Sequence, residues 1–194
     1  MPDKLVTPEA FFMFRPWKID PRKVRVVFVV SGGPFKNPKF NNGHPLSMLS
    51  KSELQQIPPS YKAFVGEYGS NLKYTIPKHQ TFASWQTKGI MMMYQYPFWD
   101  YTKHNRTAIR GWEYLAYDTC CALSDKQDKV AFVFLGKGVW PWSYAIDESK
   151  HLVLRLPYPT NYSGFLGCKV FNTLLKFLGE DRNFFKLPTS KEKR

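Results

Sequence analysis

Seven consecutive residues, Val24–Val30, form a β-branched and aromatic run that only Arg25 interrupts. Such a run is typical of a strand buried on both faces of a sheet, because neither set of alternating side chains meets water. It stops at Ser31–Pro34, where two glycines allow unusual backbone angles and a proline ends ladder pairing. We therefore expect a central strand whose carboxyl end faces a ligand-binding crevice.

Three more apolar runs, each ended by Gly or Pro, predict the remaining strands of one sheet: Gly89–Tyr96, Lys129–Leu135 and His151–Leu156. Helical spacing of apolar residues predicts helices over residues 107–123 and 163–178, and Ser60 is predicted to cap a shorter helix that ends at Tyr68. Strands that alternate with helices predict an α/β fold. We expect three α/β/α layers around a central, mostly parallel four-stranded sheet.

The length of 194 residues suits one well-filled core. Prolines and aromatic rings before residue 24 predict an N-terminal arm (1–23), followed by one domain (24–187) and a basic tail (188–194). The three cysteines lack a CxxC spacing, and no histidine has a partner at metal-ligand spacing, so we expect a reducing, intracellular setting without a metal or other cofactor. No apolar run is long enough for a membrane span, so a soluble protein is expected.

Twenty-eight Lys and Arg against fifteen Asp and Glu give a net charge of +13, which favours a polyanionic partner over a merely solvated basic surface. In a parallel sheet the segments that follow the strands meet at one edge. Serines and lysines of these segments are the candidate phosphate contacts: Ser31, Lys36, Lys39, Lys137, Ser163 and Lys169. Ser163 is expected to begin a helix whose dipole attracts an anion.

Short motifs along Val24–Leu187 resemble the Ung-type uracil-DNA glycosylases. Residues 110–113 read RGWE and residues 145–147 read AID, as is typical of that family. Residues 164–168 read GFLGC where the family has GFFGC, and Gly89 opens GIMMMY where the family has GVLLLN. The resemblance implies the family's fold and DNA as the partner, with Ser60 and Ser163 matching serines that hold the DNA backbone.

The positions that the resemblance assigns to the base pocket differ from the family's pattern. Gly33 stands at the water-activating Asp, Phe35 at the Tyr that excludes thymine, and Lys36 at the following His. Leu46 replaces the Phe that stacks on uracil, and Tyr94 replaces the Asn that reads its edge. In the loop that follows the last strand, Tyr158 replaces the catalytic His and Tyr162 the wedge Leu. We interpret Gly33, Phe35, Leu46, Tyr94 and Tyr158 as a degenerate base pocket.

The leading hypothesis is therefore a catalytically inactive protein of this fold. It would bind DNA non-specifically through the phosphate backbone, as an architectural or replication-associated subunit in a nucleus or nucleoid, with a homo-oligomer or a packaging protein as further partners. Two alternatives stay open. One is an active DNA glycosylase with altered pocket chemistry, and the other is a protein-interaction module that docks a polymerase, capsid or regulatory partner.

Overall fold

The structure is a computed structural model that describes residues 6–7, 14–33, 45, 58–74, 82–97, 99–100 and 111–188. Six strands are assigned, namely β1 Val6–Thr7, β2 Val26–Val30, β3 Ile90–Tyr94, β4 Trp99–Asp100, β5 Ala131–Leu135 and β6 Leu152–Leu156. The α-helices are α2 Pro59–Leu72, α3 Glu113–Lys126 and α4 Val170–Leu178. Short 3₁₀ helices are η1 Arg15–Lys18, η2 Pro21–Lys23, η5 Ala83–Lys88, η6 Lys137–Ala145 and η7 Arg182–Phe185.

The main sheet has four strands in the order β3-β2-β5-β6, and all of its pairs are parallel. Val26 at the start of β2 pairs with Ile90 on one side and with Ala131 on the other. The strand is thus hydrogen-bonded on both sides, and all five of its residues are buried. This confirms the predicted central strand, and the parallel four-stranded sheet confirms the predicted fold class.

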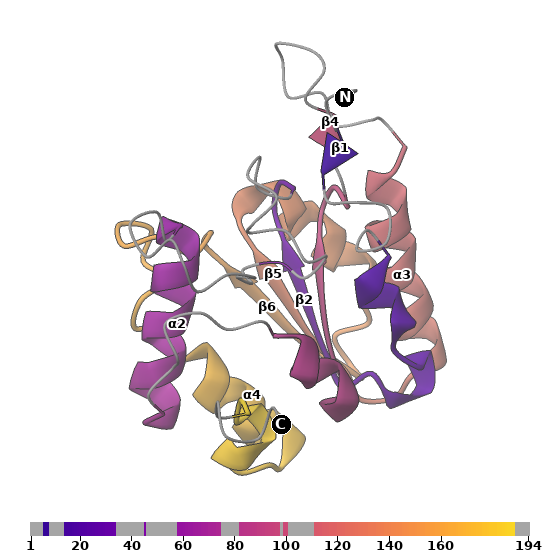
Figure 1. The fold of residues 1–194 in the computed structure, drawn as a ribbon. Coiled ribbons are helices and arrows are strands. Elements are labelled where there is room, and N and C mark those ends of the chain that lie inside the picture. The colour runs from indigo at the N-terminus through magenta and orange to yellow at the C-terminus, as the bar shows by residue number, and fades with distance from the viewer. Residues whose placement is uncertain are drawn as a thin grey trace.

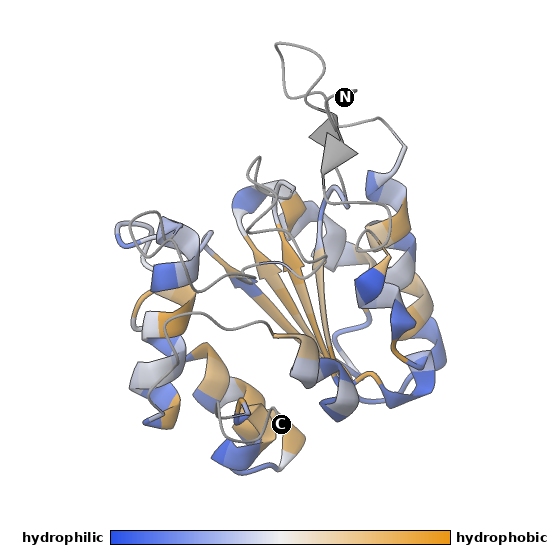
Figure 2. Ribbon diagram, viewed as in Figure 1, coloured by the Kyte–Doolittle hydropathy of each residue, from blue (hydrophilic) through white to orange (hydrophobic). Residues whose placement is uncertain are grey.

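Helices cover both faces of this sheet (Figure 1). Alternate residues of β2 face opposite ways, so Val26 and Phe28 belong to the core under α2 and α4, whereas Val27 and Val29 belong to the core under α3. The strands are almost uniformly apolar, and polar colour gathers on the helices and the connecting loops (Figure 2). The result is the expected three-layer arrangement.

Aromatic rings fill the core on the α2 and α4 side. Phe64 of α2 packs edge-on against Phe28 and Phe171, with ring centroids 5.8 and 5.5 Å apart. The Tyr68 hydroxyl and the Trp85 indole nitrogen both donate to the carbonyl oxygen of Phe185, at 3.0 and 3.1 Å. These two buried donors are satisfied by one backbone oxygen, which fixes η7 against α2 and η5.

Three predicted helix boundaries are corrected by the structure. α3 spans residues 113–126 instead of 107–123, and residues 101–110 lie outside the described part of the chain. Pro58, not Ser60, is the N-cap of α2, and Ser60 lies inside the first turn. α4 begins at Val170 instead of Ser163, because Lys169 has a left-handed backbone (φ 54°) that a continuous helix excludes.

One feature near the N-terminus was not predicted: β1 and β4 form a separate two-stranded antiparallel sheet. Trp17 anchors the N-terminal arm, as its aromatic character predicted. It packs against the core beneath α3, and its indole nitrogen donates to Thr119 Oγ1 at 2.8 Å. Among the described residues, no helix combines the length and apolar character that crossing a membrane requires.

Candidate functional site at the carboxyl edge of the sheet

The carboxyl ends of the four parallel strands meet at one edge of the sheet, and the first residues beyond them form the candidate site. Ser31 follows β2, Gln95 follows β3 and Gly136 follows β5. Backbone hydrogen bonds continue past the strands, since Ser31 N donates to Leu135 O and Gly136 N donates to Leu156 O, both at 2.8 Å. The strand ends are therefore held together as one rigid edge.

The side chain of Gln95 joins three of these segments. Its Oε1 accepts from Ser31 Oγ at 3.2 Å and from the backbone N–H of Gly32 at 3.1 Å. Its Nε2 donates to the carbonyl oxygen of Gly138 at 3.3 Å. The Gly32 N–H is an obligate donor, so the oxygen of the amide must face it, and the second N–H of Nε2 has no partner among the described residues.

Two glycines let the segment after β5 approach Ser31 closely. A Cβ added to Gly136 would lie 2.8 Å from Ser31 Cβ, and one added to Gly138 would lie 2.5 Å from Ser31 Oγ. Real Cβ atoms do not approach other heavy atoms so closely, so this packing requires glycine at both positions. Lys137, between them, is exposed to solvent at the start of η6.

Ser60 and Tyr158 bring α2 and the segment after β6 to the same edge. Burial raises the pKa of the Tyr158 phenol above its ordinary value, and a side-chain hydrogen bond with Ser60 partly opposes this shift. The Cβ and ring of Tyr158 would both lie 3.4 Å from a Cβ added to Gly136, beside Ser31. Tyr158 is therefore a neutral hydrogen-bonding group at physiological pH.

The loop before α4 carries the other predicted DNA-binding residues. Tyr162 is 99% exposed, which leaves its whole side chain open to a ligand. Ser163 does not cap α4: its Oγ accepts from the backbone N–H groups of Thr160 and Phe165 and donates to Thr160 O. The predicted helix-dipole site at Ser163 is therefore wrong, since the helix starts seven residues later.

A buried carboxylate ties this loop to α2. Glu67 is 1% exposed, and it accepts from the backbone N–H groups of Gly167 at 2.6 Å and Lys169 at 2.7 Å. The Cys168 thiol lies 3.8 Å from the same carboxylate, and burial raises the pKa of Cys168 to about 11. Lys169 itself lies immediately before α4, with its side chain partly open to solvent.

The structure thus brings Ser31, Ser60 and Tyr158 to one edge, with Lys137 beside them and Gly33 two residues beyond Ser31. Tyr94 is buried at the end of β3, in the core under α2. Four predicted residues lie outside the described part of the chain: Phe35, Lys36, Lys39 and Leu46. Whether these complete the edge stays a prediction.

Gln95 is the residue of this edge that the sequence predictions missed. The segment after Tyr94 was predicted to reach the ligand edge, and β3 does end at Tyr94, but no residue of that segment was named as a candidate. The amide side chain directly after Tyr94 was the available signal, because a polar group directly after a buried strand lies at the ligand edge of a parallel sheet. In the described residues no group of three His, Cys, Asp or Glu side chains is arranged to hold a metal ion.

No family model matches the chain. Curated relatives do: the chain is 26% identical to the uracil-DNA glycosylase of Acinetobacter baylyi over 180 residues, which cover 91% of this chain and 75% of the relative. It is also 26% identical to the uracil-DNA glycosylase of Psychromonas ingrahamii over 183 residues, with 92% of this chain and 83% of the relative covered.

Solved structures agree on the fold. The mimivirus uracil-DNA glycosylase matches with a TM-score of 0.80 at 20% identity, over 94% of this chain and 75% of that one. The enzyme from Nitratifractor salsuginis matches with a TM-score of 0.64 at 11% identity, over 96% and 83% of the two chains. At these identities the structural likeness concerns the arrangement of the elements.

The comparisons contradict the leading hypothesis of a catalytically inactive protein. The matched relatives are named uracil-DNA glycosylases, and nothing in the described residues demonstrates that activity is lost. The prediction inferred inactivity from replaced side chains, whereas a replaced side chain excludes only the group it carried. Other groups occupy the edge, and they are compatible with the alternative of altered pocket chemistry.

The motifs over residues 24–187, the parallel sheet and the curated relatives agree: the chain is similar in sequence to the uracil-DNA glycosylases and shares their fold.

Proposed function

We propose that the protein is a DNA glycosylase that releases uracil or a related base from DNA through a pocket whose groups differ from the family's pattern. The observation that carries this proposal is the similarity to named uracil-DNA glycosylases over most of the length of both chains. The polar edge formed by Ser31, Gln95 and Tyr158 supplies hydrogen-bonding groups where such a pocket requires them. The net charge of +13 favours DNA as the substrate.

Hydrolysis of the glycosidic bond places negative charge on the departing base. The oxygen of water bonds to C1′ of the deoxyribose, the C1′–N bond breaks with its electron pair on the base nitrogen, and one water proton ends on the base. A fixed hydrogen-bond donor beside the base oxygen stabilises this charge. Tyr158 is the proposed donor, because its raised pKa keeps the proton in place and Ser60 holds its hydroxyl.

Gln95 is the proposed base-reading residue. Contacts with Ser31, Gly32 and Gly138 fix the orientation of its amide, so that one N–H is available to a ligand without the entropy cost of ordering a free side chain. An amide N–H selects a base that presents a carbonyl oxygen, as uracil does. Tyr162, Lys137 and Lys169 are proposed to hold the DNA strand, the first by wedging between bases and the others by phosphate contacts.

The test measures free base released from DNA that contains uracil, hypoxanthine or a normal base, in single strands and duplexes. We expect Tyr158→Phe to lower the rate of base release by about 10²-fold, because the charged transition state loses a donor. Tyr74→Phe is the matched control, since the Tyr74 hydroxyl contacts Asn183 Oδ1, at 2.8 Å, in η7 and away from the carboxyl edge. Raising the pH to the ordinary pKa of tyrosine should not remove the contribution of Tyr158, because its raised pKa preserves its proton there.

Gln95→Leu is expected to lower activity and to weaken the preference for uracil. Gln127→Leu is the corresponding control, because Gln127 follows α3 and contacts Pro21 O, away from the carboxyl edge. If the intact protein releases no base from any of these substrates, the proposed function is wrong. If it does so but Tyr158→Phe keeps full activity, the proposed donor is wrong.

A further inference from the structure

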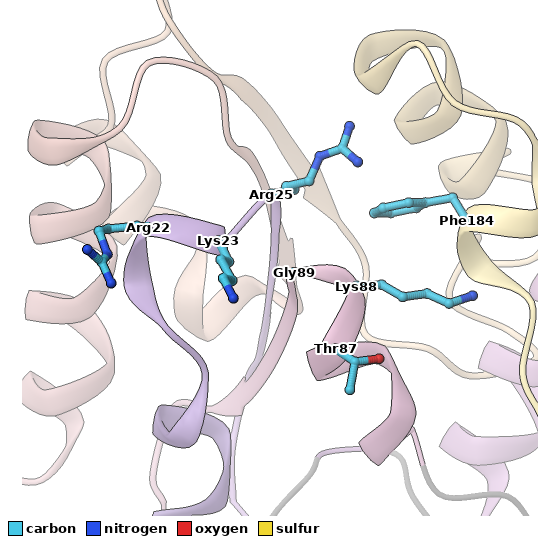
Figure 3. Close-up of a pocket in the computed structure, with 7 residues that line it drawn as sticks. All are labelled: Arg22, Lys23, Arg25, Thr87, Lys88, Gly89 and Phe184. Atoms are coloured by element: carbon cyan, nitrogen blue, oxygen red, sulfur yellow. The ribbon is translucent and has the colours of Figure 1, made fainter.

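A second pocket lies at the opposite, amino edge of the sheet. It has a volume of about 550 Å³, within the range of roughly 300–1,000 Å³ found for small-molecule sites. Its lining comes from η2, the start of β2, the end of η5 and η7: Arg22, Lys23, Arg25, Thr87, Lys88, Gly89 and Phe184 (Figure 3). The base-handling groups at the carboxyl edge do not include any of these residues.

The lining contains four cationic side chains and no carboxylate. Two carboxylates lie just outside it: Asp20 pairs with Arg22 at 3.0 Å, and Glu180 pairs with Arg25 at 2.7 Å. Within the described part of the chain, neither Lys23 nor Lys88 is paired with a carboxylate. The pocket therefore keeps two positive charges without a counterion from these residues.

Two of the cations are held in place. The Lys88 ammonium donates to the carbonyl oxygens of Asn183 and Lys186, both at 2.9 Å, and its third N–H remains for a ligand. The Arg25 guanidinium lies over the ring of Phe184, 4.9 Å from the centroid. Figure 3 shows this ring between Arg25 and Lys88, pointing toward the turn at Gly89.

The environment of Lys88 is itself cationic. Burial lowers the pKa of Lys88, and the charge of Lys186 lowers it further. A bound anion would remove part of this unfavourable interaction, so its binding is favoured at neutral pH. The exposed Lys23 lines the same pocket from η2.

We propose that this pocket binds the phosphate group of a nucleotide-sized phosphate ester. Fixed cations without a carboxylate in the lining favour phosphate, and the Phe184 ring provides an apolar wall beside it. Such a group comes from one of two sources: a free nucleotide, or a nucleotide unit within a second DNA segment. In both cases the same lysines and arginines bind the phosphate.

The geometry separates this ligand from the substrate at the carboxyl edge. Arg25 directly precedes β2 and Ser31 directly follows it, and the strand between them has five residues. At about 3.3 Å per residue, Arg25 and Ser31 lie roughly 20 Å apart along the buried strand. A ligand in the pocket therefore does not occupy the base-handling site.

Calorimetry on the intact protein with dAMP and with inorganic phosphate tests the free-nucleotide source. A second assay tests binding of a second DNA segment. The protein is first saturated with a duplex attached to beads, and the retention of a free, labelled 20-base-pair duplex is then measured. The variant is Lys23→Glu combined with Arg22→Glu, two exposed positions, and Arg22 makes its ion pair with Asp20 at the surface. The control is Lys126→Glu with Lys62→Glu, which makes the same change in net charge at exposed helix positions outside the pocket lining.

We expect the pocket variant to lower the affinity for the probe at least about tenfold at low salt, because attraction becomes repulsion. The control should lower this affinity less than about threefold. Loss of dAMP binding assigns the site to free nucleotides, and loss of duplex retention alone assigns it to a second DNA segment. Absence of both kinds of binding, or equal losses in variant and control, overturns the proposal. Base release by the pocket variant is expected to be unchanged, so this test and that of the glycosylase function fail separately.

Discussion

Glu67 is the buried carboxylate on which the loop before α4 depends. Its oxygens accept from two backbone N–H groups of that loop and from Asn71 Nδ2, the last at 2.8 Å. A carboxylate with 1% exposure is stable only when such donors replace water. Glu67 therefore couples α2, which carries Ser60, to the loop that carries Tyr162.

We predict that Glu67→Ala lowers the free energy of unfolding by about 3 kcal/mol, because buried N–H groups lose a charged acceptor. Urea denaturation followed by circular dichroism measures this change. Glu148→Ala is the control, since the Glu148 side chain is 56% exposed in its pair with Arg155. This substitution should lower the free energy of unfolding by less than about 1 kcal/mol. Equal losses for the two variants would contradict the assignment.

Site residues were predictable where a strand end identified them. Ser31 follows the most distinctive apolar run of the chain, and the resemblance of the motifs pointed to Ser60 and Tyr158. Gln95 was not predicted, although its segment was expected at the ligand edge, because the hydrogen bonds that orient its amide toward Ser31 and Gly138 join segments far apart in the sequence. The helix expected at Ser163 failed for a related reason, since Glu67, about 100 residues away in the chain, satisfies the N–H groups of residues 167 and 169.

Among the elements, the turn from η5 into β3 depends most directly on one residue. Gly89 has φ +79°, and a Cβ there would lie 2.2 Å from the carbonyl oxygen of Lys23. Its own carbonyl oxygen accepts from the N–H groups of Arg25 and Val26, at 2.8 and 3.1 Å. The turn thus fixes where β2 and β3 begin, and it forms part of the amino-edge pocket.

Gly89→Ala is predicted to destabilise the fold by more than about 2 kcal/mol, because it combines an unfavourable φ with a backbone clash. Gly179→Ala separates the two effects, since Gly179 also has positive φ (69°) but has nothing within 4 Å of the added Cβ. Its expected cost is about 1 kcal/mol. Thermal unfolding midpoints compare the variants, and similar shifts for both would show that the clash at Gly89 is relieved by movement.

The order and type of the main elements followed from the sequence, and several boundaries did not. All four strands of the main sheet were predicted, because continuous apolar runs have few other uses in a chain of this length. The pair β1 and β4 was missed, since two-residue strands carry no periodicity. The start of α3 was predicted six residues too early and that of α4 seven.

For the whole molecule, charge is the property with the widest consequence. The net charge is +13, and in the described part of the chain all the Lys and Arg residues except Arg155 lie on helices and connecting segments. Contacts of such groups with DNA release counterions. The logarithm of the affinity therefore falls linearly with the logarithm of the salt concentration.

We predict that the affinity for duplex DNA falls about 10³-fold between about 50 and 200 mM salt if roughly six phosphates are contacted. Fluorescence anisotropy at several salt concentrations gives the slope. Lys137→Ala should reduce the slope by about one unit, because it removes one phosphate contact. Tyr162→Ala should weaken binding and leave the slope unchanged. A slope near zero for the unmodified protein would contradict binding through phosphate contacts.

The sheet has a consequence for how such a protein changes over evolutionary time. Every residue of β2, β3 and β5 is buried, whereas the polar groups proposed for chemistry begin one residue beyond the strands. Substitutions of these polar groups alter reactivity without changing the buried strands. A protein of this fold can therefore exchange its reactive groups while its architecture persists.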